Sequence, residues 1–164
     1  MLTLAGRLCC RVLCAALLLA SGGAAAAEKE TRIAGLWATS GFGSLVELRP
    51  CAGAPPTICG RIVWLWEPND ELGRPRVDRN NPDRAARLRP LVGREIAWGL
   101  RETGPGVWSE GRIYNPDDGR TYTGAIRLRS GVLELEGCAL RVFCETQTWR
   151  RPAEVVAAVQ RLER

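Results

Sequence analysis

Apolar and polar residues alternate with a period of two along most of the chain, and turn-forming residues interrupt this alternation. Such alternation is typical of half-buried strands, because successive side chains point to opposite faces of a sheet. It predicts eight strands, at residues 33–39, 44–50, 58–66, 95–101, 107–115, 120–129, 132–138 and 141–150. Most connections are short, so strands that follow each other in the sequence are expected to pair antiparallel.

One hairpin has a register that can be derived from the pattern. A two-residue turn at positions 130–131 places Leu128 opposite Leu133 on an apolar face. The same register places Arg127 opposite Glu134 on the other face. An apolar face and a cross-strand charge pair are what a half-buried hairpin requires.

Residues 67–92 interrupt the strand pattern with a long polar connection. Loops of this length inside a domain are usually functional or disordered. Asn81, Pro82 and Asp83 form a helix-start signal, because they suit the cap, the first position and the first turn of a helix. We therefore predict an ordered loop that contains a short helix over residues 82–88.

The last segment, residues 152–164, has a helical period instead. Val155, Val159 and Leu162 share one face, and Glu154 stands in the first turn. This pattern predicts a short C-terminal helix that packs on the outside of the sheet.

Eight successive antiparallel strands predict an all-β fold, an eight-stranded up-and-down barrel, because closure removes exposed sheet edges. A two-sheet sandwich is the alternative. A barrel of eight strands is either filled by its own side chains or holds one small ligand.

The first 27 residues have the pattern of a secretory signal peptide. Arg7 and Arg11 precede a short apolar run, and an alanine tract ends at Ala27. The run is too short for a membrane span, and a buried N-terminal helix is the alternative. We expect one domain over residues 28–164, located in the periplasm or secreted after removal of the signal peptide.

Four cysteines remain after this removal, and an even number in an exported protein indicates two disulfides. Of the three possible pairings we favour Cys51–Cys59 and Cys138–Cys144, because each pair flanks a short connection between strands. A zinc site built from all four cysteines is the alternative, but the spacing is not of the CxxC type.

Charge and composition exclude several functions. The net charge is +5, but residues 1–27 contain two of the arginines and no acidic residue, and the remaining charges of both signs are interspersed. A nucleic-acid binder usually has a clustered basic stripe. The chain has no histidine, which excludes a Ser-His-Asp triad and His-ligated zinc or haem. We expect no cofactor and no metal.

Aromatic residues supply the candidate ligand site. Aromatic walls with a few polar anchors are typical of small-molecule pockets. The candidates are Trp64, Trp66, Trp98, Trp108 and Tyr114, with Arg89 as an anchor for an anionic head group. The alternative is that these rings fill the barrel.

Carboxylates are the only candidates for catalysis. Asp78 and Asp83 lie in the long loop, and Asp117 and Asp118 in a predicted turn. No pattern places two of them across a cleft, as a glycosidase requires. Residues 78–83 also lack the glycine and distal glutamate of a calcium loop. We interpret Asp78 and Asn81 as structural residues of the loop and expect no enzymatic activity.

Two motifs resemble those of the calycin, or lipocalin-like, barrels. Gly35-Leu36-Trp37 begins the first predicted strand, and Thr148-Trp149-Arg150 ends the last. The resemblance implies that Trp37 plugs the closed end of the barrel, with the guanidinium of Arg150 lying across its ring as a cation–π contact.

A longer series of motifs resembles the bacterial exported family catalogued as domain of unknown function 2147. In order, these motifs are Gly35–Thr39, Cys59–Val63, Asp78–Asp83, Arg89–Gly93, Gly111–Gly119, Thr121–Tyr122 and Thr146–Arg150. The resemblance implies a lipocalin-like barrel and export, and it transfers no catalytic or ligand-binding residue.

The leading functional hypothesis is a non-enzymatic periplasmic barrel that binds a small apolar or amphipathic molecule, with the loop 67–92 as a lid. The alternative is a cell-envelope accessory protein with a filled barrel, which presents its loops to a protein partner.

Overall fold

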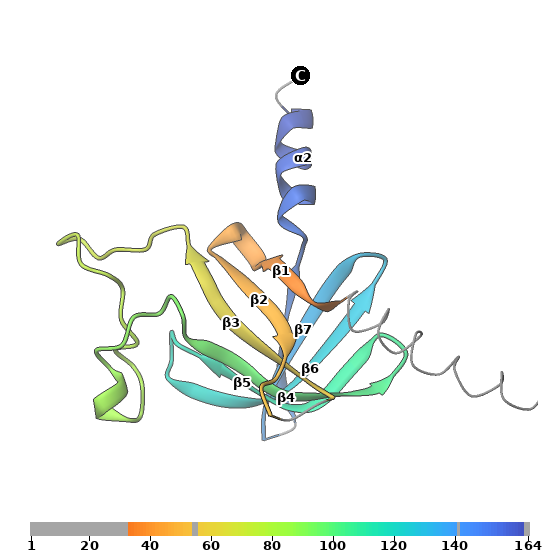
Figure 1. Cartoon of the computed structure of the whole chain (residues 1–164), viewed down its shortest axis with the longest axis horizontal. Coiled ribbons are helices and arrows are strands. Elements are labelled where there is room, and N and C mark those ends of the chain that lie inside the picture. Colours follow the sequence, from red (N-terminus) through yellow and green to blue (C-terminus); the bar gives the residue numbers. More distant parts are fainter. Residues whose placement is uncertain (1–32, 54–55, 141, 163–164) are drawn as a thin grey trace, which may run out of the picture. The chain divides into compact units, whose positions relative to one another are not determined.

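The computed structural model describes residues 33–53, 56–140 and 142–162, so the predicted signal peptide lies outside the described residues. One eight-stranded sheet forms the molecule's framework (Figure 1), and its strand order follows the sequence. All neighbouring strands are antiparallel. The strands are β1 (Gly35–Ala38), β2 (Ser44–Pro50), β3 (Thr57–Leu65), β4 (Glu95–Gly104), β5 (Val107–Asn115), β6 (Arg120–Arg129), β7 (Val132–Ala139) and β8 (Phe143–Trp149).

This architecture confirms the predicted all-β, up-and-down fold. The predicted hairpin register is also confirmed, because Leu128 pairs with Leu133 and Arg127 with Glu134. The ion pair of Arg127 is nevertheless diagonal, with 3.1 Å between its Nη1 and Oε2 of Glu136. A long arginine side chain reaches such a diagonal neighbour on one face of a sheet.

The sheet curls until β1 and β8 meet. The backbone N–H of Ala38 donates to the carbonyl of Arg150 at 2.8 Å, and that of Arg150 donates back at 3.0 Å. Next to this bridge, the Ser40 side chain takes the place of backbone pairing between the strands. Its hydroxyl donates to the carbonyl of Thr148 and accepts from the N–H of Thr148. We call the contact formed by Ala38, Ser40, Thr148 and Arg150 the seam.

The core extends along much of the barrel interior, from Ile33 before β1 to Tyr114 near the end of β5. The connections that follow β1, β3, β5 and β7 all lie at one end of an antiparallel meander, which we call the mouth. Most of the largest fully buried hydrophobic side chains come from the opposite halves of the strands or from Ile33 before β1, whereas Trp37 and Val46 lie nearer the mouth. The full set of these hydrophobic side chains is Ile33, Trp37, Val46, Leu48, Ile58, Leu100, Ile126, Leu133 and Trp149.

Three paired glycines form a row across the curled sheet. Gly111 pairs with Gly124, and Gly124 with Gly137. A Cβ atom at Gly124 would lie 2.4 Å from Cγ1 of Ile113, and one at Gly111 would lie 2.6 Å from Cγ of Leu100. Glycine in a strand often marks such a close approach, and here Gly111 and Gly124 let the side chains of Leu100 and Ile113 lie over the backbone.

The helices are short. The 3-10 turns η1 (Ser40–Phe42) and η2 (Arg84–Ala86) lie in the first and third connections, and α2 (Pro152–Leu162) follows β8. The predicted C-terminal helix is therefore confirmed, although Figure 1 shows it projecting next to β1 instead of lying along the outer face of the sheet. Among the described residues, no helix combines the length and the apolar character that crossing a bilayer requires.

Candidate functional site

The structure separates the aromatic candidates into different environments. Trp108 and Tyr114 are buried in the core, and Trp98 packs against the core from a partly exposed position. Trp64 and Trp66 are exposed at the end of β3. Arg89 is exposed in the long loop, and its backbone carbonyl accepts a hydrogen bond from the N–H of Asp78. These residues therefore do not converge on one pocket.

Phe42, Trp64 and Trp66 form an aromatic cluster at the mouth. The ring centroids of Phe42 lie 5.6 Å from Trp64 and 6.1 Å from Trp66, and the two indoles are 6.0 Å apart and nearly perpendicular. Trp66 is 66% exposed. Phe42 has a φ of 58° in the turn η1, a conformation that a bulky residue rarely adopts. The turn thus holds an aromatic ring against two exposed tryptophans.

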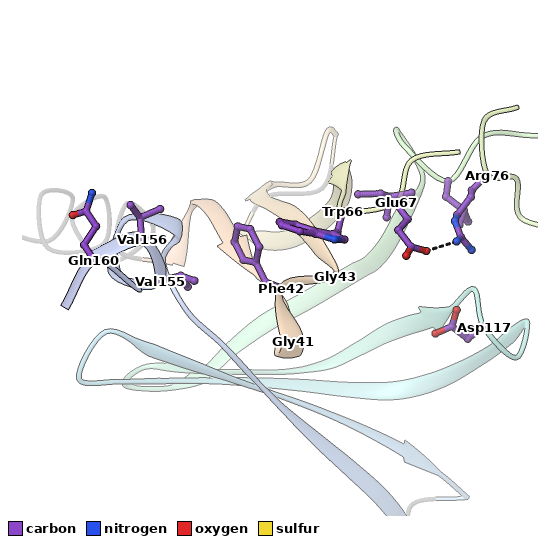
Figure 2. Close-up of a pocket in the computed structure, with 12 residues that line it drawn as sticks. Gly41, Phe42, Gly43, Trp66, Glu67, Arg76, Asp117, Val155, Val156 and Gln160 are labelled. Atoms are coloured by element: carbon purple, nitrogen blue, oxygen red, sulfur yellow. Dashed lines mark hydrogen bonds and ion pairs between the residues drawn. The ribbon is translucent and has the colours of Figure 1, made fainter. Parts of the chain in front are cut away.

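A cleft of about 640 Å³ adjoins this cluster (Figure 2). Phe42 and Trp66 lie side by side in it, with Val155 and Val156 of α2 at one end. At the other end Glu67 and Arg76 form an ion pair. The cleft is lined by Gly41, Phe42, Gly43, Leu65, Trp66, Glu67, Arg76, Leu91, Asp117, Val155, Val156 and Gln160. We call it the mouth cleft. Its lining is largely apolar, with charges concentrated at one end.

Sequence reasoning placed Trp66 in a ligand site but missed Phe42, Leu91 and Val155. Phe42 is an apolar residue within a glycine-rich turn, Ser40-Gly41-Phe42-Gly43, and an aromatic residue in such a turn was the available signal. Leu91 and Val155 come from the long loop and from α2, and only the three-dimensional arrangement brings them to one cleft.

A buried polar cluster anchors the long loop to the barrel. Asp78 is fully buried, and its carboxylate accepts hydrogen bonds from the Tyr114 hydroxyl at 2.6 Å and the Asn81 amide at 2.7 Å. Nε of Arg94 lies 3.1 Å from the same carboxylate, and its guanidinium lies over the Tyr114 ring. A buried charge with these partners is fully compensated. Asp78 and Asn81 thus join the long loop to Tyr114 of β5.

The phenol of Tyr114 stays protonated in this cluster. Burial, followed by the hydrogen bond to Asp78 and its negative charge, raises the pKa of Tyr114 to about 12. The neutral hydroxyl of Tyr114 therefore donates to Asp78 at all physiological pH values.

The predicted helix over residues 82–88 is wrong in length and in its cap. The loop contains only the single turn η2, and the cap is Asp83, whose carboxylate accepts from the N–H of Ala85 at 2.9 Å. Asn81 is unavailable as the cap because its amide donates into the buried cluster and its oxygen accepts from the N–H of Asp83.

The long loop also docks on the turn between β5 and β6. The Asn80 amide donates to the carbonyls of Pro116 at 3.2 Å and Asp117 at 2.8 Å. The backbone of Asn80 approaches Gly119 so closely that a Cβ there would lie 1.9 Å from its carbonyl oxygen. The loop is thus fixed at its centre, while Glu67, Arg76 and Leu91 line the mouth cleft.

The cation over Trp37 is Arg151, and the expectation of Arg150 is corrected by one residue. The guanidinium of Arg151 lies 3.8 Å from the ring centroid of Trp37, which is fully buried. Trp149 points inward at the end of β8, so the alternation directs Arg150 outward and Arg151 back to the side of Trp37. A Cβ at Gly35, whose φ is 101°, would lie 3.1 Å from Nη1 of Arg151.

The cysteines form the two predicted pairs. Sulfur–sulfur distances are 2.10 Å for Cys51–Cys59 and 2.04 Å for Cys138–Cys144.

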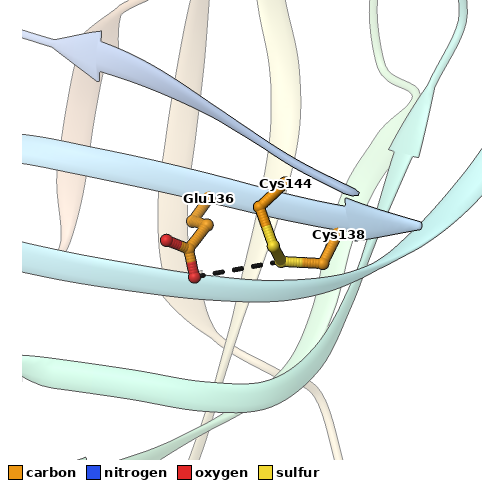
Figure 3. A group of neighbouring side chains, drawn as sticks. All are labelled: Glu136, Cys138 and Cys144. Carbon is orange, nitrogen blue, oxygen red and sulfur yellow. Dashed lines mark hydrogen bonds between the residues drawn. A yellow bond between two sulfur atoms is a disulfide. The ribbon is translucent and has the colours of Figure 1, made fainter. Parts of the chain in front are cut away.

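Figure 3 shows Glu136 beside the second disulfide, with its carboxylate oxygen 3.9 Å from Sγ of Cys138. This is a cluster of three potential metal-ligating residues. With both sulfurs in a disulfide it contains no thiolate, which is the form of cysteine that binds metals. The pairs lie in separate hairpins, which excludes the four-cysteine zinc alternative.

A second cavity, of about 500 Å³, lies over β5 to β8 and shares no lining residue with the mouth cleft. Its lining includes Ile113, Tyr122, Leu135, Phe143 and Glu145. We call it the concave cavity. The residue pattern of β8 indicates this cavity, because Glu145 and Gln147 lie on the same side of the strand as the buried Trp149. Polar residues at inward positions indicate that the barrel is not filled there.

Fold and cavities together define the chain as a lipocalin-like barrel. A solved structure with a TM-score of 0.61 is described as "Protein HP1028 from the human pathogen Helicobacter pylori belongs to the lipocalin family". It is 22% identical in sequence, and the match covers 76% of this chain and 86% of that one. The chain belongs to the family described as "Uncharacterized protein conserved in bacteria (DUF2147)", whose model matches residues 35–151. No curated protein matches it.

Proposed function

We propose that this protein is an exported, non-enzymatic barrel that binds a small apolar or amphipathic molecule in the mouth cleft. The observation that carries the proposal is the cleft itself, about 640 Å³ with Phe42, Leu65 and Trp66 in its wall. Volumes of this size with mostly apolar walls and few polar groups are typical of small-molecule sites. The Glu67–Arg76 ion pair at one end supplies the polar anchor for an amphipathic ligand.

The long loop acts as a fixed wall of this site. Its centre is held by the buried cluster around Asp78, and Leu91 and Arg76 face the ligand from its two arms. The lid of our hypothesis is thus pre-organised, which lowers the entropic cost of binding.

Three of the four carboxylates that were candidates for catalysis are engaged in local structure, and the fourth, Asp117, lines the mouth cleft. Asp83 caps η2, and Asp118 accepts a hydrogen bond from the N–H of Arg120 in the β5–β6 turn. Asp78 is buried against three partners. These bonds favour binding over catalysis, since a general acid or base must reach a substrate.

Export is the second part of the proposal. Structural disulfides persist in oxidising compartments, and the chain has two of them. Removal of residues 1–27 and a location in the periplasm or outside the cell fit both this chemistry and the N-terminal pattern. Fractionation of cells, with N-terminal sequencing of the protein recovered, tests this part. An intact N-terminus in the cytoplasm would contradict it.

Ligand binding is tested in two ways. Native mass spectrometry of protein taken from the periplasm should reveal a consistent added mass. The fluorescent amphiphile 1-anilinonaphthalene-8-sulfonate should bind the purified protein, and Trp66→Ala should weaken it by about fivefold or more because an aromatic wall is lost. Leu72→Ala is the matched control, because Leu72 is 74% exposed outside the cleft. Bare protein together with equal effects of the two variants would reject the proposal.

A protein-binding role is the second candidate, and one observation favours it. Leu140 and Val142 in the turn between β7 and β8, and Phe143 at the start of β8, are each at least 74% exposed. Exposed apolar patches often mark interaction sites. An envelope protein that presents this turn to a partner would lose the interaction on Val142→Ser and Phe143→Ser, with probe binding in the mouth cleft unchanged.

A further inference from the structure

The concave cavity differs in chemistry from the mouth cleft. Its apolar part consists of side chains such as Ile113 and Leu135, which are 7% exposed. Tyr122 and Phe143 add two aromatic rings. Glu145 comes from β8. Thus one cavity of about 500 Å³ combines an apolar surface, aromatic rings and negative charge.

The charges of this lining have one sign. Asp118 and Glu145 are its charged members, and no arginine or lysine lines the cavity among the described residues. This contrasts with a chain whose net charge is +5. An anionic ligand would therefore meet repulsion here, and a cationic ligand would be attracted.

The two carboxylates are not equivalent. Asp118 accepts hydrogen bonds from the Tyr122 hydroxyl and from the backbone N–H of Arg120. The hydrogen bond to Asp118, burial and the negative charge of Asp118 raise the pKa of Tyr122, whereas Arg120 lowers it, so Asp118 is already engaged by Tyr122. The Glu145 carboxylate has no hydrogen-bond or ion-pair partner among the described residues. Its charge is the one available to a ligand.

The register of β7 and β8 directs Glu145 into the cavity. Glu145 pairs with Gly137, two positions from the pair Leu135–Gln147 and four from the pair Leu133–Trp149. Side chains two residues apart share a face, so Glu145 lies on the face of the buried Trp149. Gly137 has no side chain to cover it, which leaves room above the strand pair.

We propose that the concave cavity binds an organic cation, an amine or quaternary ammonium with a short apolar group. The ammonium is held by Glu145 and by the π-electrons of Tyr122 and Phe143. The apolar group contacts Ile113 and Leu135. A metal ion is a poorer occupant, because Asp118 and Glu145 belong to no cluster of three close ligand atoms in the described part of the chain. This site is separate from the mouth cleft, so either proposal can fail alone.

Three probes with the same six-carbon tail test the charge preference: hexyltrimethylammonium, 1-hexanol and hexanoate. Each is titrated into the purified protein, with the methyl NMR signals of Ile113 and Leu135 as the readout. The cation should bind about fivefold or more tightly than the alcohol, since a cation–π contact or ion pair contributes on this scale. Hexanoate should bind more weakly than the alcohol.

Glu145→Gln should lower the affinity for the cation about fivefold and leave that for 1-hexanol unchanged. Glu134→Gln is the matched control. It also removes one carboxylate charge, but Glu134 lies on β7 and points to the opposite face of the sheet, away from the cavity. Two results would each overturn the proposal: equal affinities for cation and anion, or equal effects of the two variants. Shifts confined to the Phe42 and Trp66 signals would likewise reject it, since they would assign the cation to the mouth cleft.

Discussion

Two consecutive arginines at the end of β8 have opposite roles because side chains alternate along a strand. Arg151 covers the Trp37 ring and donates Nη1 to the carbonyl of Ala34, just before β1, and to that of Leu36 in β1. Arg150 contributes its backbone to the seam and its side chain to the solvent. The resemblance that pointed to Arg150 identified the right interaction but could not resolve a shift of one position at the strand end.

Replacing each arginine by alanine separates these roles. Arg151→Ala should lower the free energy of unfolding by about 1–3 kcal/mol, since it removes a cation–π contact and two charged hydrogen bonds. Arg150→Ala should change it by less than about 0.5 kcal/mol. Urea denaturation followed by tryptophan fluorescence measures both. A larger effect at Arg150 would contradict the stacking that we describe.

Tyr114 predicts a specific loss of stability in alkali. Its pKa is about 12 in the folded protein, above the ordinary value of 10.0. The folded state therefore retains the proton at pH values where the unfolded state releases it. The stabilisation is complete below pH 10 and is lost as the pH rises towards 12.

We expect a decrease of about 1–3 kcal/mol between pH 9 and pH 12 from this group. Tyr114→Phe should already be less stable at pH 7, because Asp78 loses a donor, and its further loss in alkali should be smaller. Denaturation curves of both proteins at several pH values provide the measurement. Parallel pH dependences would rule out this role of Tyr114.

At the scale of elements, the glycine row predicts unequal costs for one substitution. Gly124→Ala places a Cβ 2.4 Å from Ile113, so it should destabilise the protein by about 1–3 kcal/mol through overpacking. Gly137→Ala meets only ordinary contact, with 3.6 Å to Cβ of Tyr122, and should be nearly neutral. Thermal unfolding of the two variants tests this, and Ile113→Ala should restore part of the loss at Gly124. Equal melting temperatures would refute the steric argument.

The two disulfides should contribute similarly to stability. They close short chain segments, with sequence separations of 8 for Cys51–Cys59 and 6 for Cys138–Cys144. In the chain-entropy model, cross-links of this length contribute about 2–3 kcal/mol each. Serine substitution of either pair should lower the free energy of unfolding by about this amount, and of both by about the sum. The loss should disappear when both proteins are compared in reductant.

How far the elements could be predicted depends on how local their causes are. The strands follow from a period of two, and the 130–131 turn fixes the register of Leu128 against Leu133. The cap of η2 was misplaced because Asn81 bonds Tyr114, which is 33 positions away. The mouth cleft was only partly foreseen, since Phe42, Leu91 and Val155 come from the first connection, the long loop and α2. No periodicity links residues that only the tertiary fold brings together.

For the whole molecule, the structure combines the two alternatives that the sequence left open. The core around Trp37 and Trp149 is filled by its own side chains. The mouth cleft and the concave cavity adjoin this core. A packed core holds the strands rigidly, so binding residues at the mouth are positioned by a scaffold that ligand exchange need not disturb.

The seam has a consequence for the order in which the barrel folds. Every ladder in the sheet joins strands that are neighbours in the sequence, whereas the seam joins Ala38 to Arg150 across most of the described chain. Closing a long segment costs more entropy than closing a hairpin, so the seam should form last and open first. In hydrogen exchange, the amides of Ala38 and Arg150 should lose protection before those of Val46 and Ile126. The barrel would then open as a curved sheet that unzips along one line while its hairpins persist.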